Sequence, residues 1–201
     1  YDATKNILTT HCSNAATVSG EEYVGGICGY AQGYVNKYTY DSITIGEAKI
    51  SYSYNTGNVF SSKRSAGGIV GYAKGDSDTY NGYYFYAYIY VDNCMNIGNI
   101  ETIDSAGGIF GSELYSKCSR SYSIGTITAE SNFGGCFGTE PDTVTFCYYL
   151  DDSVVNPTCT AGVAKSEDQL RKKGTYEQWD FDTVWTMEGR DDYPYPELRS
   201  V

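Results

Sequence analysis

The chain is poor in several residue types, and each shortage argues against a class of protein. Its 201 residues include four prolines, two methionines and one histidine. Lysine and arginine total 14 against 25 acidic residues, a formal net charge of −11. Nucleic acids and anionic lipids are bound through basic surfaces, so neither is expected as a main partner. No apolar run approaches the ~20 residues that a membrane span needs, so we expect no direct membrane insertion.

Motifs of catalysis and metal binding are also missing from the sequence. It contains no HExxH, GxSxG or Walker motif and no CxxC pair, which argues against the corresponding hydrolases, nucleotide-binding enzymes and zinc sites. The single histidine, His11, adjoins Cys12, and neighbouring side chains on a strand point to opposite faces, so these two form no catalytic dyad. We therefore expect a protein that is not an enzyme and has no cofactor.

Paired carboxylates are the remaining candidates for catalysis. They occur at Asp151–Asp152 and at Asp191–Asp192. Some β-helical enzymes cleave polysaccharides with two acids, so an intrinsic polysaccharide hydrolase or lyase is kept as a lesser alternative. Both pairs fall in loop or tail segments, where adjacent acids usually form a solvated turn, and that is the preferred interpretation.

The segment DSDTYNG at 76–82 is similar to a calcium-binding loop, with Asp76, Asp78 and Asn81 as weak ligand candidates. Its Asn-Gly comes one residue too late for the D-x-D-x-N-G pattern, and no bidentate glutamate follows at the required distance. An acidic turn is the default interpretation, and we expect no metal site.

Glycine and tyrosine are abundant, with 23 and 22 copies. A composition rich in glycine, tyrosine and acidic residues fits an extracellular β protein better than a cytosolic enzyme. The chain is long enough to bury a sizeable core. Because it begins abruptly at Tyr1, we expect it to be part of a larger polypeptide.

Two short patterns recur together four times along the chain. A double-glycine pattern (GGICG, GGIVG, GGIFG, GGCFG) begins at residues 25, 67, 107 and 134. Each copy is preceded by a turn-and-strand pattern (NAATV, NTGNV, NIGNI, SIGTI) at 14–18, 55–59, 96–100 and 123–127. Linked motifs in a fixed order predict one supersecondary unit stacked on copies of itself.

The spacing of the copies predicts a parallel β-solenoid with loops on one side. The copies lie 42, 40 and 27 residues apart, and 27 residues fit one coil of two or three short strands. The extra residues of the longer units fall near 30–46 and 72–88, after the double-glycine pattern, as insertions do in solenoids. We therefore predict an all-β chain, a right-handed parallel β-solenoid (β-helix) of four to five coils over residues 1–165.

Alignment of the copies assigns most repeat residues to structure. We expect two inward columns of apolar side chains: Ile27, Ile69, Ile109 and Cys136, and Val18, Val59, Ile100 and Ile127. The double glycines would allow a positive φ and let the backbone pack closely against the next coil. The aligned Asn14, Asn55 and Asn96 are interpreted as a turn and an amide ladder in preference to a ring of ligands.

Most of the seven cysteines are interpreted as small buried apolar residues. Cys136 and Cys118, for example, occupy repeat positions that hold isoleucine or valine in other copies. An odd number leaves at least one cysteine unpaired. Cys147 and Cys159 close a short loop and are the best disulfide candidates, but the sequence alone leaves the connectivity open.

The most unusual segment is YYFYAYIYV at 83–91. Alternation along a strand sends Phe85, Ala87, Ile89 and Val91 inward and places four tyrosines on the other face, Tyr84, Tyr86, Tyr88 and Tyr90. The first insertion adds Tyr30, Tyr34, Tyr38 and Tyr40, and stacking of the units would place the two insertions side by side. Such a face suits glycan or protein recognition, with Tyr84, Tyr86, Tyr88, Tyr90, Tyr38 and Tyr40 as candidate contacts. The alternative is that the tyrosines only pair across strands and stiffen the sheet.

Residues 166–201 are predicted to form a capping segment that contains a short helix. Ser166 and Gln169 have the spacing of a capping box, and Gly174 would end the helix after Lys173. The apolar cluster that follows, with Trp179 and Trp185, is expected to cover the open edge of the stack. Stacking of the two tryptophans on a sugar is the alternative.

The pattern YNTGNV at 54–59 followed by AGGIVGY at 66–72 resembles the GLUG repeat. The resemblance covers about residues 9–165, with four good copies and a fifth, degenerate one near 146–163. The tail also resembles the segment that ends such arrays. The fourth copy departs from the pattern at Cys136 and at SIGT, so its edge is expected to be less regular.

GLUG repeats occur in secreted and surface-anchored bacterial proteins, including adhesins and the non-catalytic regions of immunoglobulin A peptidase-like proteins. The resemblance therefore implies a bacterial extracellular or cell-surface location. It favours an adhesion or spacer module that binds glycan or host surface protein through the tyrosine-rich insertions. The main alternative is an accessory region that positions a peptidase or glycosidase domain of a large secreted hydrolase.

Overall fold

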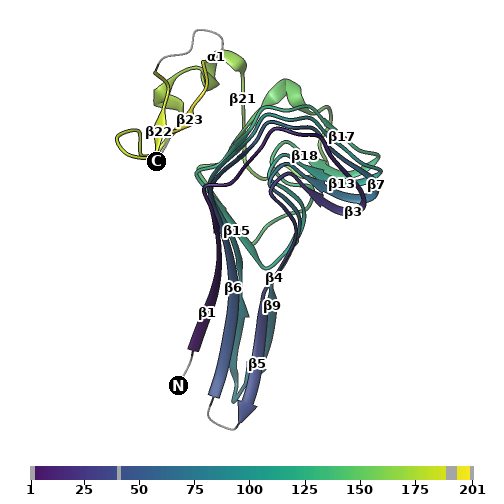
Figure 1. Cartoon of the computed structure of the whole chain (residues 1–201), viewed down its shortest axis with the longest axis vertical. Helices are drawn as coiled ribbons and strands as arrows, with labels where there is room; N and C mark the ends of the chain where they lie inside the picture. Colours follow the sequence, from purple (N-terminus) through teal and green to yellow (C-terminus); the bar gives the residue numbers. More distant parts are fainter. Residues whose placement is uncertain (1–2, 40–41, 189–193, 200–201) are drawn as a thin grey trace.

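The computed structural model describes residues 3–39, 42–188 and 194–199. About 58% of the chain is strand and 5% is helix, with largely parallel sheets, so the predicted all-β class is confirmed. Figure 1 shows stacked rounds of chain, a long projection that carries the ends of β5 (Tyr34–Thr39) and β9 (Asp76–Tyr80), and a C-terminal segment beside the stack. No helix in the described part is long and apolar enough to cross a membrane.

Three sheets carry the stack. The largest has ten strands: β1 (Ala3–Thr10), β2 (Ser13–Asn14), β5, β6 (Ser42–Asn55), β11 (Ile89–Asn96), β15 (Ser116–Ser119), β16 (Tyr122–Ser123), β19 (Thr143–Thr145), β20 (Tyr148–Leu150) and β21 (Val163–Lys165). The second has six: β3 (Val18–Gly25), β7 (Val59–Gly67), β12 (Ile100–Glu101), β13 (Asp104–Gly107), β17 (Ile127–Thr128) and β18 (Ser131–Gly134). The third has three: β4 (Cys28–Gln32), β8 (Val70–Lys74) and β14 (Phe110–Leu114).

The chain visits these sheets in the same order in each round, and each strand lies parallel to its equivalent in the next round. Asn14 pairs with Asn55, Asn55 with Asn96, and Asn96 with Ser123. The partners in the first two pairs lie farther apart in the sequence than those in the third pair, because the first two rounds each carry an insertion. The shortest round lacks one, because a single residue, Tyr115, joins β14 to β15.

The apolar core runs along the inside of the rounds. Ile69, Ile109 and Cys136 are fully buried in one column, and Val59 and Ile100 are buried in the other, together with Ile127. The first members of the two columns, Ile27 and Val18, are only partly buried and pack against the same core. They belong to the first round, which has a neighbouring round on one side only.

The three aligned asparagines form an amide ladder. Asn14 Nδ2 donates to Asn55 Oδ1 at 2.8 Å, and Asn55 Nδ2 donates to Asn96 Oδ1 at 2.8 Å. Each amide also bonds a backbone carbonyl two residues on, as Asn55 does to Gly57 at 2.7 Å. Asn55 and Asn96 are fully buried, so the ladder satisfies polar groups that water cannot reach.

The double glycines serve close packing alone, and the expectation of a positive φ at these positions is wrong. Only Gly82 and Gly162 have positive φ among the described glycines. A Cβ atom on Gly68 would lie 2.2 Å from the carbonyl oxygen of Gly108, and one on Gly26 would lie 2.3 Å from that of Gly68. Successive rounds therefore touch backbone to backbone at this motif, which leaves no room for a side chain.

Left-handed residues of other types turn the chain at the corners. One column of positive φ comprises His11, Tyr52, Asn93, Arg120 and Phe146, and a second comprises Tyr23, Ser65, Ser105 and Asn132. Non-glycine residues seldom adopt this conformation. Its recurrence at aligned positions shows that each round bends at the same two places.

Both insertions are hairpins. In the first, β5 pairs antiparallel with the start of β6, and in the second, β9 pairs antiparallel with β10 (Tyr83–Ala87). Asn81 and Gly82, with φ of 49° and 80°, form the two-residue turn of the second hairpin. The segment at 83–91 is therefore not one strand, because β10 ends at Ala87 and the chain continues from Ile89 in the parallel sheet as β11.

The C-terminal segment begins with helix α1 (Glu167–Leu170), which is shorter than expected. The predicted capping box is present, with Ser166 accepting from the Gln169 N–H and Gln169 reaching back to the Ser166 N–H. The helix does not reach Lys173, because Lys172 is extended and the Tyr176 hydroxyl bonds the Leu170 carbonyl at 2.7 Å. The remaining elements are short: the 3-10 turns η1 (Asp151–Ser153) and η2 (Lys173–Thr175), and the antiparallel pair β22 (Trp185–Thr186) and β23 (Glu197–Leu198).

This segment covers the side of the stack and does not cap its open edge, which corrects the sequence-based expectation (Figure 1). Trp179 and Trp185 pack with an outward-facing column of the large sheet, made of Met95, Tyr122 and Tyr148. The end of the stack is instead flanked by residues 151–162, where Thr158 and Cys159 donate to the Phe133 carbonyl of β18. Both indoles are buried, which removes the sugar-stacking alternative for them.

Candidate ligand-binding surface

Four tyrosines form a continuous row from the second hairpin onto the large sheet. We call Tyr84, Tyr86, Tyr88 and Tyr90 the tyrosine ladder. Successive ring centroids lie 6.5, 5.7 and 6.1 Å apart. Tyr84 is 71% exposed and Tyr86 38%, and the other two are half-buried. The row arises because alternate residues share one face of β10 and of the start of β11, while Ala87 and Ile89 point into the protein and are fully buried.

Residues from other rounds border the ladder, and sequence analysis did not identify them. The Tyr115 ring lies 5.6 Å from that of Tyr86. Lys117 Nζ lies 3.6 Å from the ring centroid of Tyr88, within the range of a cation–π contact. Lys117 pairs with Tyr90 in the sheet register, so alignment of the rounds would have placed it beside the ladder.

Glu47 fixes the inner end of the ladder. Its Oε1 accepts from the Tyr90 hydroxyl at 3.2 Å and from the Tyr88 N–H at 3.4 Å. Burial raises the pKa of Tyr90 to about 12, and the Glu47 charge adds to this rise. Burial also raises the pKa of Tyr88. Both hydroxyls therefore stay protonated at neutral pH and act as neutral donors or acceptors.

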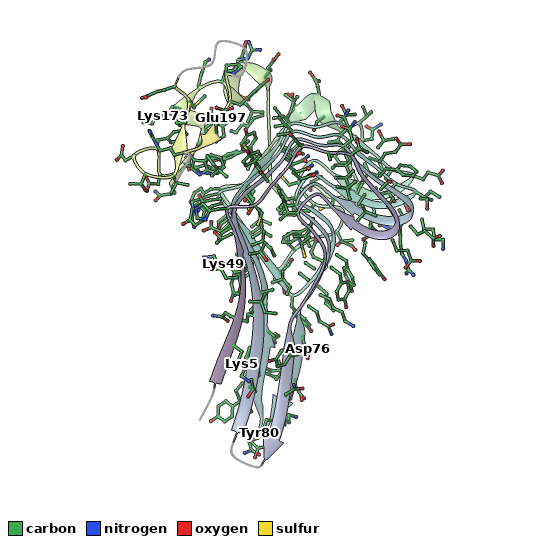
Figure 2. All side chains as sticks on the ribbon, in the orientation of Figure 1. Lys5, Lys49, Asp76, Tyr80, Lys173 and Glu197 are labelled. Atoms are coloured by element: carbon green, nitrogen blue, oxygen red, sulfur yellow. The ribbon has the colours of Figure 1, made fainter. Side chains whose placement is uncertain are left out.

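The two hairpins lie side by side and are joined by polar contacts. Lys37 Nζ lies 2.9 Å from Asp78 Oδ1, and the Val35 N–H donates to Asp76 Oδ2 at 2.9 Å. The bond from Lys37, with a further one from the Thr79 N–H, lowers the pKa of Asp78. Figure 2 shows Asp76 and Tyr80 along this projection. The candidate contact Tyr38 has no described side chain, and Tyr40 lies outside the described residues.

The weak calcium candidates Asp76, Asp78 and Asn81 have structural roles in the hairpins. The carboxylates of Asp76 and Asp78 bond groups of the first hairpin, and Asn81 forms the turn of the second. Across the described residues, no three His, Cys, Asp or Glu side chains are grouped so that they could hold a metal ion. The acidic segment therefore acts as a connection between the hairpins.

Only one of the two acid pairs, Asp151–Asp152, lies within the described residues. Asp151 and Asp152 are exposed in the turn η1 after β20, where Asp151 Oδ1 accepts from the next N–H at 2.9 Å. The pair at Asp191–Asp192 lies outside the described residues. Asp151 and Asp152 follow β20, whereas the tyrosine ladder lies on β10 and the start of β11.

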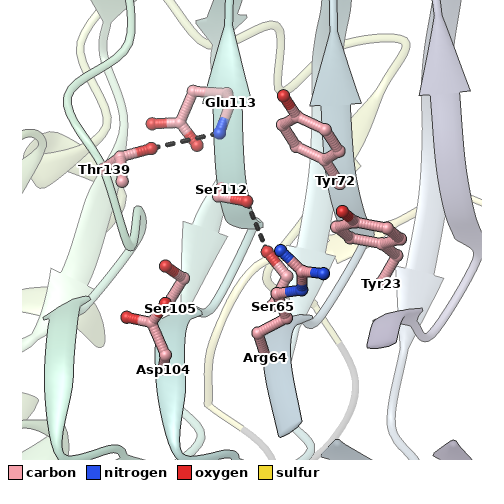
Figure 3. Close-up of a pocket in the computed structure, with 9 residues that line it drawn as sticks. All are labelled: Tyr23, Arg64, Ser65, Tyr72, Asp104, Ser105, Ser112, Glu113 and Thr139. Carbon is pink, nitrogen blue, oxygen red and sulfur yellow. Dashed lines mark hydrogen bonds between the residues drawn. The ribbon is translucent and has the colours of Figure 1, made fainter. Parts of the chain in front are cut away.

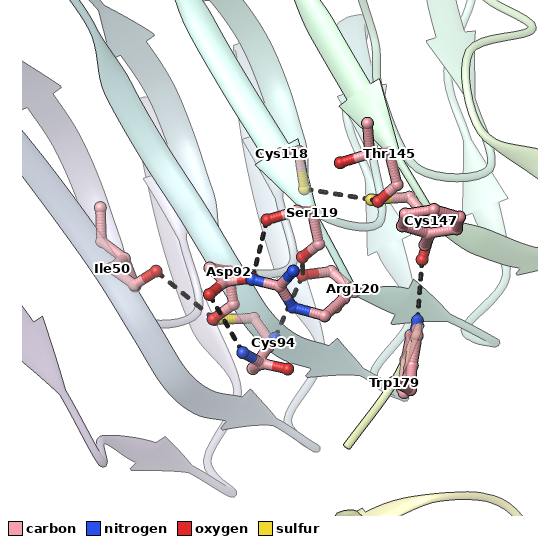
Figure 4. A network of polar contacts seen from close by, with 12 residues as sticks. Ile50, Asp92, Cys94, Cys118, Ser119, Arg120, Thr145, Cys147 and Trp179 are labelled. Carbon is pink, nitrogen blue, oxygen red and sulfur yellow. Dashed lines mark hydrogen bonds and ion pairs between the residues drawn. The ribbon is translucent and has the colours of Figure 1, made fainter. Parts of the chain in front are cut away.

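All seven cysteines are free, so the best disulfide candidates from the sequence, Cys147 and Cys159, are not bonded to each other. Cys147 Sγ instead lies 3.5 Å from Cys118 Sγ in the neighbouring round (Figure 4), while Cys159 Sγ contacts Glu140 Oε2 at 3.2 Å. Burial raises the pKa of Cys118 and Cys136 well above the ordinary thiol value. These thiols are therefore poor nucleophiles and act as apolar core residues.

Two hollows flank the sheets. A groove of about 1150 Å³ lies where the C-terminal segment leaves the first rounds of the large sheet uncovered, and His11 stacks on Tyr52 at its edge with centroids 5.2 Å apart. A smaller pocket of about 310 Å³ lies at the corner between the second and third sheets, and Figure 3 shows its lining. Neither was expected from the sequence, because their linings come from different rounds.

Comparison with known proteins adds no relative. No protein-family model, curated protein or solved structure matches the chain.

Proposed function

We propose that this chain is a non-catalytic adhesion or spacer module of a bacterial cell-surface or secreted protein. It binds glycan or a host surface protein through the tyrosine ladder. The stack of parallel rounds is a right-handed β-solenoid built from GLUG-type repeats. In this proposal the solenoid is the scaffold, and the hairpin insertions carry the contact surface.

The observation that carries the proposal is the exposure of aromatic rings in an ordered row. Tyrosines that only stiffened a sheet would be covered, whereas Tyr84 is 71% exposed at the outer end of the ladder. Tyrosine offers a broad apolar ring with a polar rim, at a low cost in side-chain entropy. A region that only positions a neighbouring hydrolase domain needs no such row, so the ladder favours binding over that alternative.

A matched pair of variants tests this proposal. Tyr83 and Tyr84 are neighbours on β10, are 72% and 71% exposed, and point to opposite faces of the hairpin. Wild type, Tyr83→Ser, Tyr84→Ser and the triple variant Tyr84→Ser/Tyr86→Ser/Tyr88→Ser would be screened on arrays of glycans and extracellular-matrix proteins. Circular dichroism and thermal melting would verify the fold of each variant.

We expect Tyr84→Ser to weaken binding by about tenfold and the triple variant to abolish it, while Tyr83→Ser binds as wild type. Stacking of a single ring contributes about 1–3 kcal/mol in comparable aromatic platforms, which is the basis of this estimate. Unchanged binding by a folded triple variant would exclude the ladder as the contact surface.

A further inference from the structure

The small pocket arises because two columns of the repeat lose their tyrosines. In the third sheet, Tyr30 pairs with Tyr72, and Tyr72 pairs with Ser112. At the second left-handed corner, Tyr23 is followed in later rounds by Ser65 and then Ser105. Each change from tyrosine to serine removes a ring from an aligned position, and the removed rings leave a hollow of about 310 Å³.

One wall of the pocket is aromatic. The rings of Tyr23 and Tyr72 stack with centroids 5.1 Å apart and an interplanar angle of 24°. Tyr30 packs edge-on against Tyr72 at 5.5 Å and supports it from the far side. Figure 3 shows Tyr23 and Tyr72 along one side of the pocket, with Ser112 between Tyr72 and the opposite side. The wall therefore presents a fixed apolar surface beside the empty serine positions.

The rest of the lining is hydroxyl-rich and carries two carboxyl groups, Asp104 and Glu113. Burial raises the pKa of Glu113 well above the ordinary value, so this carboxyl is neutral. Ser65 and Ser112 are hydrogen-bonded to each other, and Ser105 and Thr139 also line the pocket. Burial disfavours the charged form of Asp104, but hydrogen bonds from Asn132, Ser131 and Ser105 outweigh it and lower the pKa of Asp104. Asp104 is thus an ionised carboxylate at neutral pH, held in place by donors from the neighbouring round.

The charges of the pocket select against anions. The Arg64 guanidinium lies 3.2 and 3.1 Å from the two carboxylate oxygens of Glu22 and 5.5 Å from the Tyr23 ring centroid. It is therefore already neutralised, whereas Asp104 offers lone pairs to a donor. A ligand that fits must supply hydroxyl donors and acceptors on one edge and an apolar face for the tyrosine wall.

We infer that this pocket is a saccharide-binding site for a single neutral pyranose ring. A pyranose has hydroxyl groups around its edge and C–H groups on its face, which complement Asp104 with the serines and Tyr72 with Tyr23, respectively. The volume lies near the lower end of the range of ligand pockets, about 300–1,000 Å³, as expected for a ring of this size. This site is separate from the tyrosine ladder and does not depend on the function proposed for it.

Saturation-transfer NMR and calorimetry with free glucose, galactose, mannose, N-acetylglucosamine and N-acetylgalactosamine test the inference. Ser112→Tyr places a tyrosine in the column that already holds Tyr30 and Tyr72. The new side chain fills the hollow and is of a type that the repeat accommodates at this position. Asp104→Asn removes the charge with little change of shape. Tyr83→Ser, at a position that is 72% exposed and lies outside both the ladder and the pocket, is the control, and inorganic phosphate and choline serve as charged probes.

We expect at least one sugar to bind wild type and Tyr83→Ser equally. Ser112→Tyr should abolish that binding, and Asp104→Asn should weaken it by about tenfold or more, because hydrogen bonds to a charged group are strong. The inference is overturned if no sugar binds, if binding survives both pocket variants, or if it is lost in Tyr83→Ser. Binding of phosphate or choline in place of a sugar would also overturn it.

Discussion

The indole Nε1 of Trp185 donates a hydrogen bond of 2.9 Å to the side-chain oxygen of Asn93, across 92 residues of sequence. Asn93 has a left-handed backbone, with φ of 51°, at a corner of the rounds. Trp185 is fully buried and its ring centroid lies 4.4 Å from that of Trp179. This bond ties the C-terminal segment to the side of the stack at a point where the chain turns.

Loss of this bond should loosen the C-terminal segment. Trp185→Phe keeps most of the apolar ring but leaves the buried Asn93 amide oxygen without its donor, which costs about 1–3 kcal/mol. Urea unfolding should show a lower free energy of unfolding, and limited proteolysis should cut the segment faster. Val155→Ala, at a position that is 76% exposed, is the control and should behave as wild type. Equal stability of Trp185→Phe and wild type would contradict the account.

An asparagine in the buried middle of the amide ladder should contribute more to the free energy of unfolding than one at its end. Asn55→Ala removes bonds to both Asn14 and Asn96 within the core, so it should cost about 2–4 kcal/mol, and more than Asn14→Ala at the end of the ladder. Chemical denaturation of the two variants measures the difference. A cost at Asn14 equal to or larger than that at Asn55 would show that the ladder does not act as a buried network.

The Glu113 carboxyl, whose two oxygens are buried, should make stability depend on pH. Neither of its carboxylate oxygens has a hydrogen-bond partner, and burial raises its pKa well above the ordinary value. The folded state therefore retains a proton that the unfolded state loses above its pKa of about 4.3. Stability from this group is complete below that pH and falls as the pH rises toward the folded pKa.

Glu113→Gln removes this dependence because its side chain stays neutral. Melting temperatures of wild type and Glu113→Gln should be similar near pH 4, and the variant should become the more stable of the two as the pH rises to 8. Glu101→Gln, at an exposed position, is the control and should not show this trend. A constant difference between Glu113→Gln and wild type at all pH values would mean that folding does not raise the pKa of Glu113.

Thiol labelling should separate the cysteines by burial. In the native protein iodoacetamide should modify Cys12, which is half-buried, much faster than Cys94, whose pKa burial raises to about 12. After unfolding, all seven should react, as measured by mass spectrometry of peptides. A native peptide that links Cys147 to Cys159 would contradict the free-thiol state.

The sequence predicts the inside of the rounds well and their outside poorly. Inward positions such as Ile69 and Ile109 recur at fixed places in the repeat, and burial restricts them to apolar types, so alignment places them. The left-handed corners hold residues as different as Tyr52, Asn93 and Arg120, which share a backbone angle but no sequence signature.

The outer surfaces of the rounds are not predicted from the sequence for a related reason. The C-terminal segment packs against a column that contains Met95, Tyr122 and Tyr148. The sequence around these residues does not distinguish this covered column from an exposed face of the sheet. Likewise, alternation alone places Tyr84 and Tyr86 on one face, but the break between strands at Tyr88 and the neighbouring Lys117 depend on the register between rounds. Tertiary packing decides these features.

We propose that the hairpin insertions bind the ligand, whereas the repeat forms the scaffold. The next round of the chain is a template for testing this proposal. Lys74 pairs with Leu114 and Ile89 pairs with Ser116, so residues 75–88 occupy the place that Tyr115 alone fills in the next round. Replacing 75–88 by a single tyrosine removes the second hairpin and the outer end of the ladder.

Binding of this hairpin-less chain to the array ligands of wild type is the most direct measurement. This chain should give a β-type circular dichroism spectrum and unfold cooperatively, as wild type does, but should not bind those ligands. A folded hairpin-less chain that binds its ligands with unchanged affinity would contradict the claim and place recognition on the repeat itself.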